Sequence, residues 1–236
     1  MRMLVVNPNT TASMTRKIGL AAKAAASPGT EILAVNPDEG PASIEGYFDE
    51  AMSLAGLIRT VGRHRDADAI VIACFDDTGL DAVRCMTEAP VLGIGEAAFH
   101  AAAMLSNTFS VVTTLSRSIP AIQHNLVRYG LASRCGKVRA SEVPVLDLER
   151  EGSDACLKIS DEIARAIETD RAEAIVLGCA GMTDLAHNLS AQHGVPVIDG
   201  VAAAVSMAEA LARIGLKTSK RGGYALPIAK PGSAIA

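Results

Sequence analysis

Two stretches of the sequence, ADAIVIAC at residues 67–74 and AEAIVLGC at residues 172–179, resemble each other and lie 105 residues apart. Each stretch has a short acidic lead, then an apolar run, and then a cysteine. Two further pairs keep nearly the same offset: PVLG at 90–93 with PVID at 196–199, and LVV at 4–6 with SVV at 110–112. Three landmarks in one order at one offset indicate an internal repeat.

Both halves of the chain alternate short apolar runs with segments of helical periodicity, a pattern typical of βαβ units around a buried parallel sheet. The sequence therefore predicts an α/β protein with two similar, flavodoxin-like parallel-sheet domains related by a pseudo-two-fold axis, with the active site between them. Strands are predicted at residues 3–7, 30–35, 68–74, 90–94, 109–114, 137–143, 173–178 and 195–198. Helices are predicted at residues 12–25, 47–64, 78–87, 96–106, 117–129, 154–169, 182–192 and 201–214. The tail after Gly215, which includes Pro231 and Gly232, has no periodic signal and is predicted to be a surface loop.

Composition excludes several classes of function. A net charge of -4, an aromatic content of 3% and the absence of tryptophan do not fit nucleic-acid binding. No apolar run approaches the ~18 residues that span a bilayer, and the first residues leave no room for a signal peptide. The five cysteines are too sparse for a disulfide scaffold and form no close pair for a metal. We therefore expect a cytoplasmic protein with free thiols, no metal, no membrane and no nucleic-acid partner.

Cys74 and Cys179 end the two repeated runs, and ligands of open α/β sheets bind beyond the carboxyl ends of strands. Facing each other across one cleft, a thiolate could remove a proton from one face of a carbon while a thiol returns one to the other. Residues 78–79 and 183–184 resemble helix starts, whose backbone N–H groups would lower the thiol pKa. A cysteine at a strand end can also be a small core residue, but symmetric placement favours chemistry. The remaining cysteines have no symmetry mate and are interpreted as structural: Cys85, Cys135 and Cys156.

Four segments resemble the hydantoin racemase and allantoin racemase branch of the aspartate/glutamate racemase superfamily: NPNTTASM at 7–14, PASIEG at 41–46, ACFDDTGL at 73–80 and GCAGM at 178–182. The similarity covers essentially the whole chain. It implies a cofactor-independent racemase in which Cys74 and Cys179 are catalytic, and a last helix that packs back onto the first domain. The expected domains are residues 1–96 plus 205–236, and residues 97–204.

The residues beside the two cysteines bear on the substrate. Glutamate racemases typically follow the first cysteine with Asn-Thr and the second with Thr-His, whereas this chain has Phe75-Asp76 and Ala180-Gly181. This difference counts against a free amino acid. By the resemblance, the substrate-binding residues are Asn9, Ile44, Phe75, Asp76, Thr113, Thr114, Ala180 and Gly181. Asn9 and Thr113 would hold carbonyl or ring nitrogen atoms and Phe75 the flat face of a ring, although a helix cap, a strand-end turn and a core side chain explain these three equally well.

The sequence GIGEAA at 93–98 fits a dinucleotide-binding fingerprint, but it follows the fourth predicted strand and lacks the acidic residue expected ~20 positions on. Asp76 and Asp77 could form an acid–base pair, but neighbouring side chains point apart, so only one is expected to face the cleft. We expect the two sulfurs to lie about 6–9 Å apart, with one ring carbon between them, and Thr10 or Thr11 to cap the first helix.

The leading hypothesis is a hydantoin racemase that inverts C5 of 5-substituted hydantoins, with the two cysteines alternating as base and acid. The first alternative is an allantoin racemase with the same mechanism. The second alternative is a non-catalytic ureide-binding protein on the same fold. In each case the partner is a small cyclic ureide, and by analogy with relatives the protein is expected to be a homo-oligomer.

Overall fold

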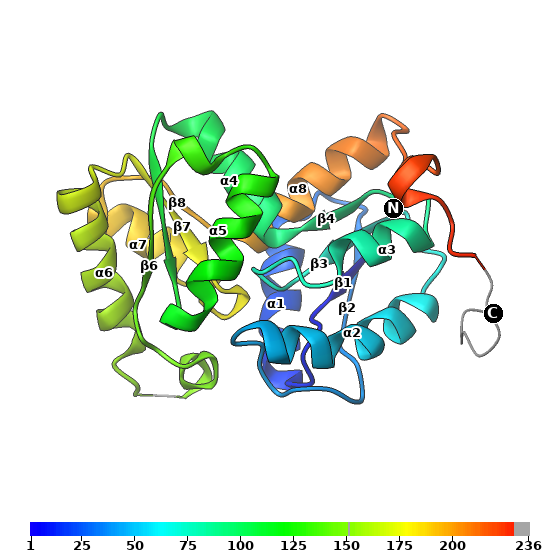
Figure 1. Ribbon diagram of the computed structural model, residues 1–236, viewed down its shortest axis with the longest axis horizontal. Helices are drawn as coiled ribbons and strands as arrows, with labels where there is room; N and C mark the ends of the chain where they lie inside the picture. Colours follow the sequence, from blue (N-terminus) through cyan, green and yellow to red (C-terminus); the bar gives the residue numbers. More distant parts are fainter. Residues whose placement is uncertain (151, 229–236) are drawn as a thin grey trace.

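The computed structural model describes residues 1–150 and 152–228, and within them each half of the chain forms one parallel four-stranded sheet (Figure 1). The strands are β1 (Arg2–Val6), β2 (Glu31–Val35), β3 (Ala69–Ile72), β4 (Val91–Gly93), β5 (Phe109–Thr113), β6 (Cys135–Ala140), β7 (Ala174–Gly178) and β8 (Val197–Ile198). The α-helices are α1 (Ala12–Ala25), α2 (Tyr47–Gly62), α3 (Leu80–Met86), α4 (Ile94–Leu105), α5 (Ile119–Arg128), α6 (Ala155–Asp170), α7 (Ala186–His193) and α8 (Gly200–Arg213). Short 3₁₀ turns are η1 (Ser116–Ser118), η2 (Ala132–Arg134), η3 (Val145–Glu149), η4 (Ala180–Met182) and η5 (Gly222–Tyr224).

The two sheets have the same topology, with strand orders β2-β1-β3-β4 and β6-β5-β7-β8. This confirms the predicted repeat of two flavodoxin-like halves, and every predicted strand and helix is present. The register aligns Val6 of β1 with Ile72 of β3, and Thr113 of β5 with Gly178 of β7. The central strands of each sheet therefore end at one edge, where Cys74 and Cys179 follow.

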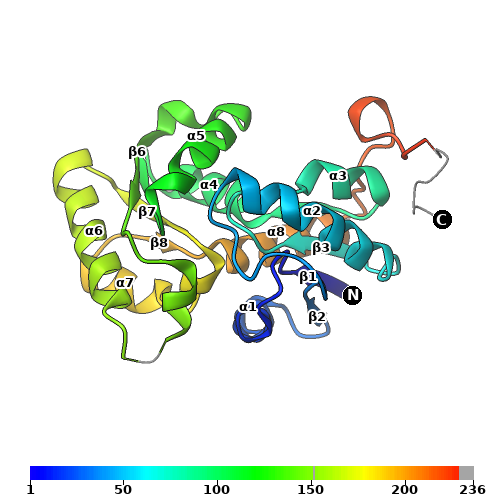
Figure 2. The ribbon, with the colours of Figure 1, turned by 60° about the horizontal axis from the view of Figure 1, so that its bottom comes forward.

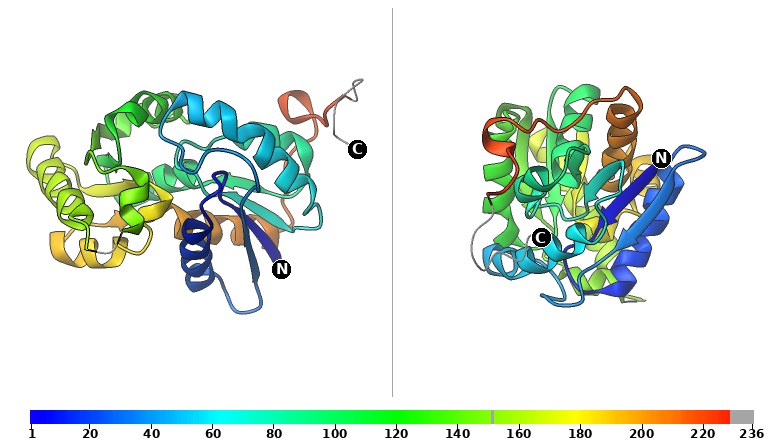
Figure 3. Two further views of the ribbon diagram at one scale, coloured as in Figure 1. Left: turned by 90° about the horizontal axis from the view of Figure 1, so that it is seen from below. Right: turned by 90° about the vertical axis from the view of Figure 1, so that its right-hand side faces the viewer.

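Helices cover both faces of each sheet, which explains why the central strands are apolar along their whole length. In the first half, α2 and α3 pack on one face and α1 and α8 on the other (Figure 3). The inward faces of the two sheets share one hydrophobic core, in which Val5 and Val71 of the first half join Phe109 and Val176 of the second. The two halves are therefore held together by apolar burial.

Helices α4 and α8 lie side by side between the sheets (Figure 1). Helix α8 packs against α1 and β3 of the first half, whereas α4 packs against β7 of the second. The final helix of each half thus crosses to the other half. The expected domain boundaries at residues 96/97 and 204/205 fall within α4 and α8, and the division into domains stays a prediction.

The start of α1 differs from expectation. Thr11 occupies the N-cap position, but its hydroxyl makes no capping hydrogen bond and donates instead to the Ala42 carbonyl at 2.6 Å. The predicted threonine cap is therefore wrong, because this side chain is engaged by the β2–α2 loop. Thr10 also binds that loop, since its backbone N–H donates to the Pro41 carbonyl at 3.0 Å. These contacts fix the loop that carries Ile44 beside the start of α1.

On one side of the molecule, α2 of the first half and α5 of the second approach each other (Figure 2), and Tyr47 and His124 share a hydrogen bond of 3.1 Å between them. The tail after Gly215 runs along α3, where the Thr218 N–H donates to the Glu88 carbonyl at 2.8 Å. From Leu216 to residue 228, the last that the structure describes, it is a surface loop as predicted, with η5 as its one short helical turn. Pro231 and Gly232 lie outside the described residues. Within the described part of the chain, none of the helices has the length and apolarity that crossing a bilayer requires.

Candidate active site

Both repeated cysteines line one cavity of about 30 Å³ at the carboxyl ends of the central strands of the two sheets. Cys74 lies two residues beyond β3, and Cys179 directly follows β7. The cavity is lined by Asn7, Asn9, Met14, Ile44, Ala73, Cys74, Phe75, Asp76, Thr114, Ser118, Val145, Gly178, Cys179 and Ala180. The structure therefore brings together both predicted catalytic cysteines and six of the eight predicted substrate-binding residues.

Thr113 and Gly181 are the two predicted binding residues that do not line this cavity. The Thr113 hydroxyl donates to the Gly178 carbonyl at 2.9 Å, so it joins the ends of β5 and β7. Gly178 permits this contact because a Cβ there would lie 2.7 Å from the Thr113 Cβ. Gly181 lies behind Cys179, and its backbone N–H donates to the sulfur at 3.4 Å. Both residues position the wall of the cavity.

Asp76 and Asp77 point in different directions, as predicted. Asp76 lines the cavity, whereas the Asp77 carboxylate accepts the backbone N–H groups of Gly95 and Glu96 at 2.9 and 2.8 Å. Asp77 also accepts the Tyr129 hydroxyl of the other half at 2.7 Å. The N-terminus of α4, where a dinucleotide phosphate would bind, is thus occupied by a carboxylate.

The glycines of the fingerprint-like sequence GIGEAA are explained by the same packing. A Cβ at Gly93 would lie 2.0 Å from the Asp77 Oδ1, and a Cβ at Gly95 would lie 2.3 Å from the Phe75 carbonyl oxygen. Glycine is therefore required for close approach between α4 and the loop that carries Cys74.

Burial dominates the electrostatics of the cavity. It raises the pKa of Asp76 to about 7, and the neighbouring carboxyls of Glu50 and Asp77 act in the same direction. Burial likewise raises the pKa of the Cys179 thiol to about 12, and it raises the pKa of Cys74 further. The prediction that helix starts lower these pKa values is therefore wrong, because loss of hydration outweighs the backbone N–H groups. After Cys179 there is only the 3₁₀ turn η4, and α7 begins at Ala186 instead of near residue 182.

Two loops meet over the cavity. Ile44 comes from the loop after β2 and Val145 from the equivalent loop after β6, and the Val145 N–H donates to the Glu45 Oε1 at 2.8 Å. A volume of about 30 Å³ holds one or two water molecules. This volume is too small for a substituted ring, so we expect the two loops to move apart when such a ligand binds.

Several residues of the cavity were not anticipated from the sequence: Asn7, Met14, Ala73, Ser118, Val145 and Gly178. The internal repeat held a signal for one of them, because the loop that carries Val145 is the counterpart of the loop that carries Ile44. The contacts of Lys17 and Glu50 with groups beside the cysteines were also missed. Lys17 lies on α1 and Glu50 on α2, and a repeat seen in the strands does not show how these helices pack.

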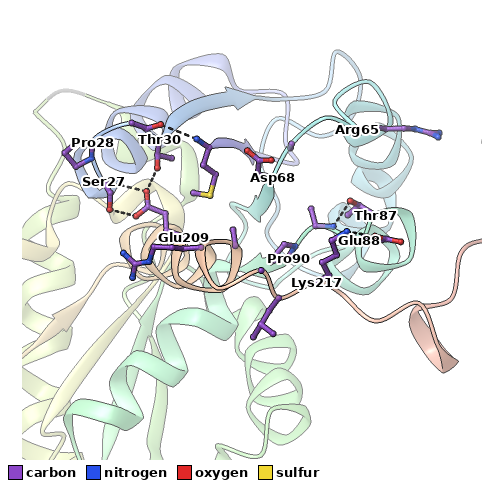
Figure 4. Close-up of a pocket in the computed structure, with 18 residues that line it drawn as sticks. Ser27, Pro28, Thr30, Arg65, Asp68, Thr87, Glu88, Pro90, Glu209 and Lys217 are labelled. Atoms are coloured by element: carbon purple, nitrogen blue, oxygen red, sulfur yellow. Dashed lines mark hydrogen bonds and ion pairs between the residues drawn. The ribbon is translucent and has the colours of Figure 1, made fainter.

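A larger hollow of about 820 Å³ lies at the opposite, amino edge of the first sheet (Figure 4). Several of its polar groups are engaged with one another: the Glu209 carboxylate accepts the Ser27 and Thr30 hydroxyls at 2.7 and 2.6 Å, and Lys217 pairs with Glu88 at 2.9 Å. None of the predicted site residues lines it. The small cavity at the carboxyl edge is therefore the candidate active site.

Comparison with known proteins agrees with this geometry. The model of the Asp/Glu/Hydantoin racemase family matches residues 3–208. The chain belongs to this family. This racemase-family chain is 48% identical over 229 residues to hydantoin racemase from Rhizobium meliloti, covering 96% of this chain and 95% of the relative. It is 46% identical to hydantoin racemase from Pseudomonas sp. (strain NS671), again over 229 residues, with coverage of 96% and 92%.

A solved structure is equally similar. Allantoin racemase from Klebsiella pneumoniae superimposes with a TM-score of 0.96 at 48% identity, covering 99% of this chain and 96% of that one. The family and these similarities confirm the resemblance inferred from the cysteine motifs and the α/β fold. They also make the protein an isomerase of the racemase class.

Proposed function

We propose that this racemase inverts C5 of 5-substituted hydantoins, with Cys74 and Cys179 as its two acid–base residues. The observation that carries the proposal is that both thiols line one cavity and come from symmetry-related strand ends of the two halves. This origin supports a position for one thiol on each face of a ring bound between the halves. Inversion requires this arrangement, since the proton must leave one face and return to the other.

In the reaction, one thiolate removes the C5 proton: the C–H bond breaks, an S–H bond forms, and the electron pair moves onto the adjacent ring carbonyl as an enolate. The opposite thiol then protonates C5 from the other face and becomes a thiolate. The enantiomer is inverted and the two sulfurs have exchanged protonation states. A raised thiol pKa makes the thiolate a strong base toward a carbon acid, but it also makes the thiolate fraction small near neutral pH.

Asn9 supports stabilisation of the enolate oxygen. Its Oδ1 accepts the Asn7 side-chain amide at 2.8 Å and the Thr11 backbone N–H at 2.9 Å. With the oxygen held by two donors, the amide nitrogen is directed away from them, and its one contact is the weak acceptor Met14 Sδ at 3.3 Å. We propose that this N–H group donates to a ring carbonyl, where negative charge develops in the transition state.

The other lining residues are proposed to shape the site. Phe75 is held edge-on against Phe99, with ring centroids 5.3 Å apart, so it forms a rigid apolar wall beside Cys74. Ile44 and Ala180 add apolar surface for the C5 substituent, and Thr114 and Asp76 add polar groups. Thr113 and Gly181 would act on substrate only through the residues they position.

The allantoin racemase reaction is the second candidate, favoured by the similarity to a solved allantoin racemase structure. It uses the same two-thiol mechanism on a ring with a polar ureido substituent. The mixture of apolar Ile44 and Phe75 with polar Asp76 around the cavity is compatible with both substituents.

We further propose a cytoplasmic homo-oligomer with a first domain of residues 1–96 plus 205–236 and a second of residues 97–204. Unpaired cysteines at five positions support a reducing compartment. The crossing of α8 onto α1 and β3 supports the discontinuous first domain. Similarity to racemases over nearly the whole chain supports a cyclic ureide as the partner of the cavity.

The proposal is tested by giving the purified protein one enantiomer of a 5-alkyl hydantoin in D₂O without added metal or cofactor. We expect optical rotation to decay while deuterium replaces the C5 hydrogen, and thiol alkylation to stop both. Allantoin and L-glutamate are run in parallel. Faster turnover of allantoin would transfer the assignment to the second candidate, turnover of glutamate alone would contradict the substrate class, and no exchange with any of the three would favour a binding protein.

A further inference from the structure

The two cysteines have unequal surroundings, although the fold that carries them is symmetric. Each is followed four residues later by a threonine, Thr78 after Cys74 and Thr183 after Cys179. Only Thr78 contacts its cysteine, with its Oγ1 3.4 Å from the sulfur. Both sulfurs also contact the backbone N–H two residues on, that of Gly181 at 3.4 Å from Cys179 and that of Asp76 beside Cys74. The two sites differ in the charged side chain that bonds to Thr78 in one case and to Gly181 in the other.

Beside Cys74, the Thr78 hydroxyl also contacts a carboxylate. The Thr78 hydroxyl donates to the Glu50 Oε1 at 3.5 Å, and Glu50 comes from α2 of the same half. A hydroxyl has one proton, so when it points to Glu50 its oxygen is free to accept the S–H of Cys74. In this orientation the chain of hydrogen bonds stabilises the neutral thiol, whereas a Thr78 hydroxyl turned toward the sulfur would lower the thiol pKa. The negative charge of Glu50 opposes ionisation of Cys74 in either orientation.

Beside Cys179, the backbone carbonyl of Gly181 contacts an ammonium group. Lys17 of α1, in the other half, donates to the Gly181 carbonyl at 2.7 Å and pairs with Asp184 at 3.0 Å. Lys17 thus holds the turn whose N–H donates to Cys179, and an N–H can only donate, so the contact favours the thiolate. The positive charge of Lys17 acts in the same direction.

We infer that Cys179 is the thiol that ionises first and therefore acts first as the base, while Cys74 acts first as the acid, with Lys17 and Glu50 as the positioning residues that cause this difference. This inference rests on the two-thiol function proposed above. The remaining charged groups do not reverse it. Asp76 opposes ionisation of both thiols, and Glu45 opposes that of Cys179. The backbone N–H of Asp76 near Cys74 parallels that of Gly181 and therefore adds no asymmetry.

The test titrates each thiol separately by the ultraviolet absorbance of its thiolate, which requires no substrate. In a background with Cys85, Cys135 and Cys156 changed to serine, Cys74→Ser leaves only Cys179 and Cys179→Ser leaves only Cys74. We expect the titration midpoint of Cys179 to lie below that of Cys74. Lys17→Met should raise the Cys179 midpoint by about one pH unit, and Glu50→Gln should lower the Cys74 midpoint by a similar amount, each without moving the other thiol.

Two variants serve as matched controls. Lys23→Met removes an ammonium group from the last turn of α1, and Glu39→Gln removes an exposed carboxylate that pairs with Arg59. Neither should move either midpoint. The inference is overturned if Cys74 titrates below Cys179, or if Lys17→Met leaves Cys179 unchanged. Racemisation is assayed on the unmodified protein, so its absence would refute the proposed function, whereas a reversed titration order in an active racemase would refute only this inference.

Discussion

Gly95→Ala is expected to lower the racemase activity strongly, although Gly95 does not line the cavity. The added Cβ would lie 2.3 Å from the Phe75 carbonyl oxygen and 2.9 Å from the Asp77 Oδ2, against 3.4 Å for ordinary contact. The loop and the helix must therefore separate by about 1 Å. Helix α4 is held by α8 and β7, so the shorter loop that carries Cys74 moves. A displacement of about 1 Å at a reacting group costs on the order of 10²-fold in rate, whereas overpacking costs only about 1–3 kcal/mol of stability.

The assay combines the rate of hydantoin racemisation with urea unfolding monitored by circular dichroism. Gly62→Ala is the matched control, because it also lies in a helix but its Cβ would meet nothing nearer than the Met86 Cε at 4.0 Å. We expect Gly62→Ala to keep full activity and Gly95→Ala to remain folded with activity lowered about 100-fold. Normal activity in Gly95→Ala would show that this close approach does not position Cys74.

Two further predictions concern charge and access. Burial and the charges of Glu50 and Asp77 raise the pKa of Asp76 in the folded protein, so the native state binds an extra proton and its unfolding free energy falls as pH rises toward about 7. Asp76→Asn should therefore lose less thermal stability than the unaltered protein between about pH 4 and pH 7, and an equal loss would contradict the pKa shift. Glu45→Ala removes the hydrogen bond to Val145 across the cavity, worth about 1.5 kcal/mol, so alkylation of both cavity thiols should accelerate about tenfold. Glu39→Ala on the same loop is its control, and unchanged alkylation in Glu45→Ala would mean that the two loops do not limit access.

Much of the fold was predictable because the repeat is encoded in buried parallel strands, whose apolar runs are long and continuous. The runs at 67–74 and 172–179 identified β3 and β7, and with them the strand ends at which ligands bind. Residues near those ends, such as Asn9 and Phe75, were predictable for the same reason. That only one of Asp76 and Asp77 faces the cavity was also predictable, because two adjacent side chains in a turn point in different directions.

The errors and omissions arise where tertiary contacts decide. Thr11 has a strong preference for capping, yet a loop carbonyl far along the chain takes its hydroxyl. Helix-like residues after Cys179 form only a 3₁₀ turn, which Lys17 of the other half holds in place. The pKa of each thiol depends on burial, which no motif reports. Contacts between distant helices and loops were therefore beyond the reach of local patterns.

The central claim is that Cys74 and Cys179 act on opposite faces of one carbon. The direct measurement follows C5 hydrogen exchange in D₂O for Cys74→Ser and Cys179→Ser, with each hydantoin enantiomer supplied separately. We expect racemisation to fall at least ~10²–10⁴-fold in both variants, while each still exchanges one enantiomer and the two preferences are opposite. Cys156→Ser, at an exposed position, should behave as the unaltered protein. Normal racemisation in either cavity variant, or exchange of the same enantiomer by both, would contradict the two-face mechanism.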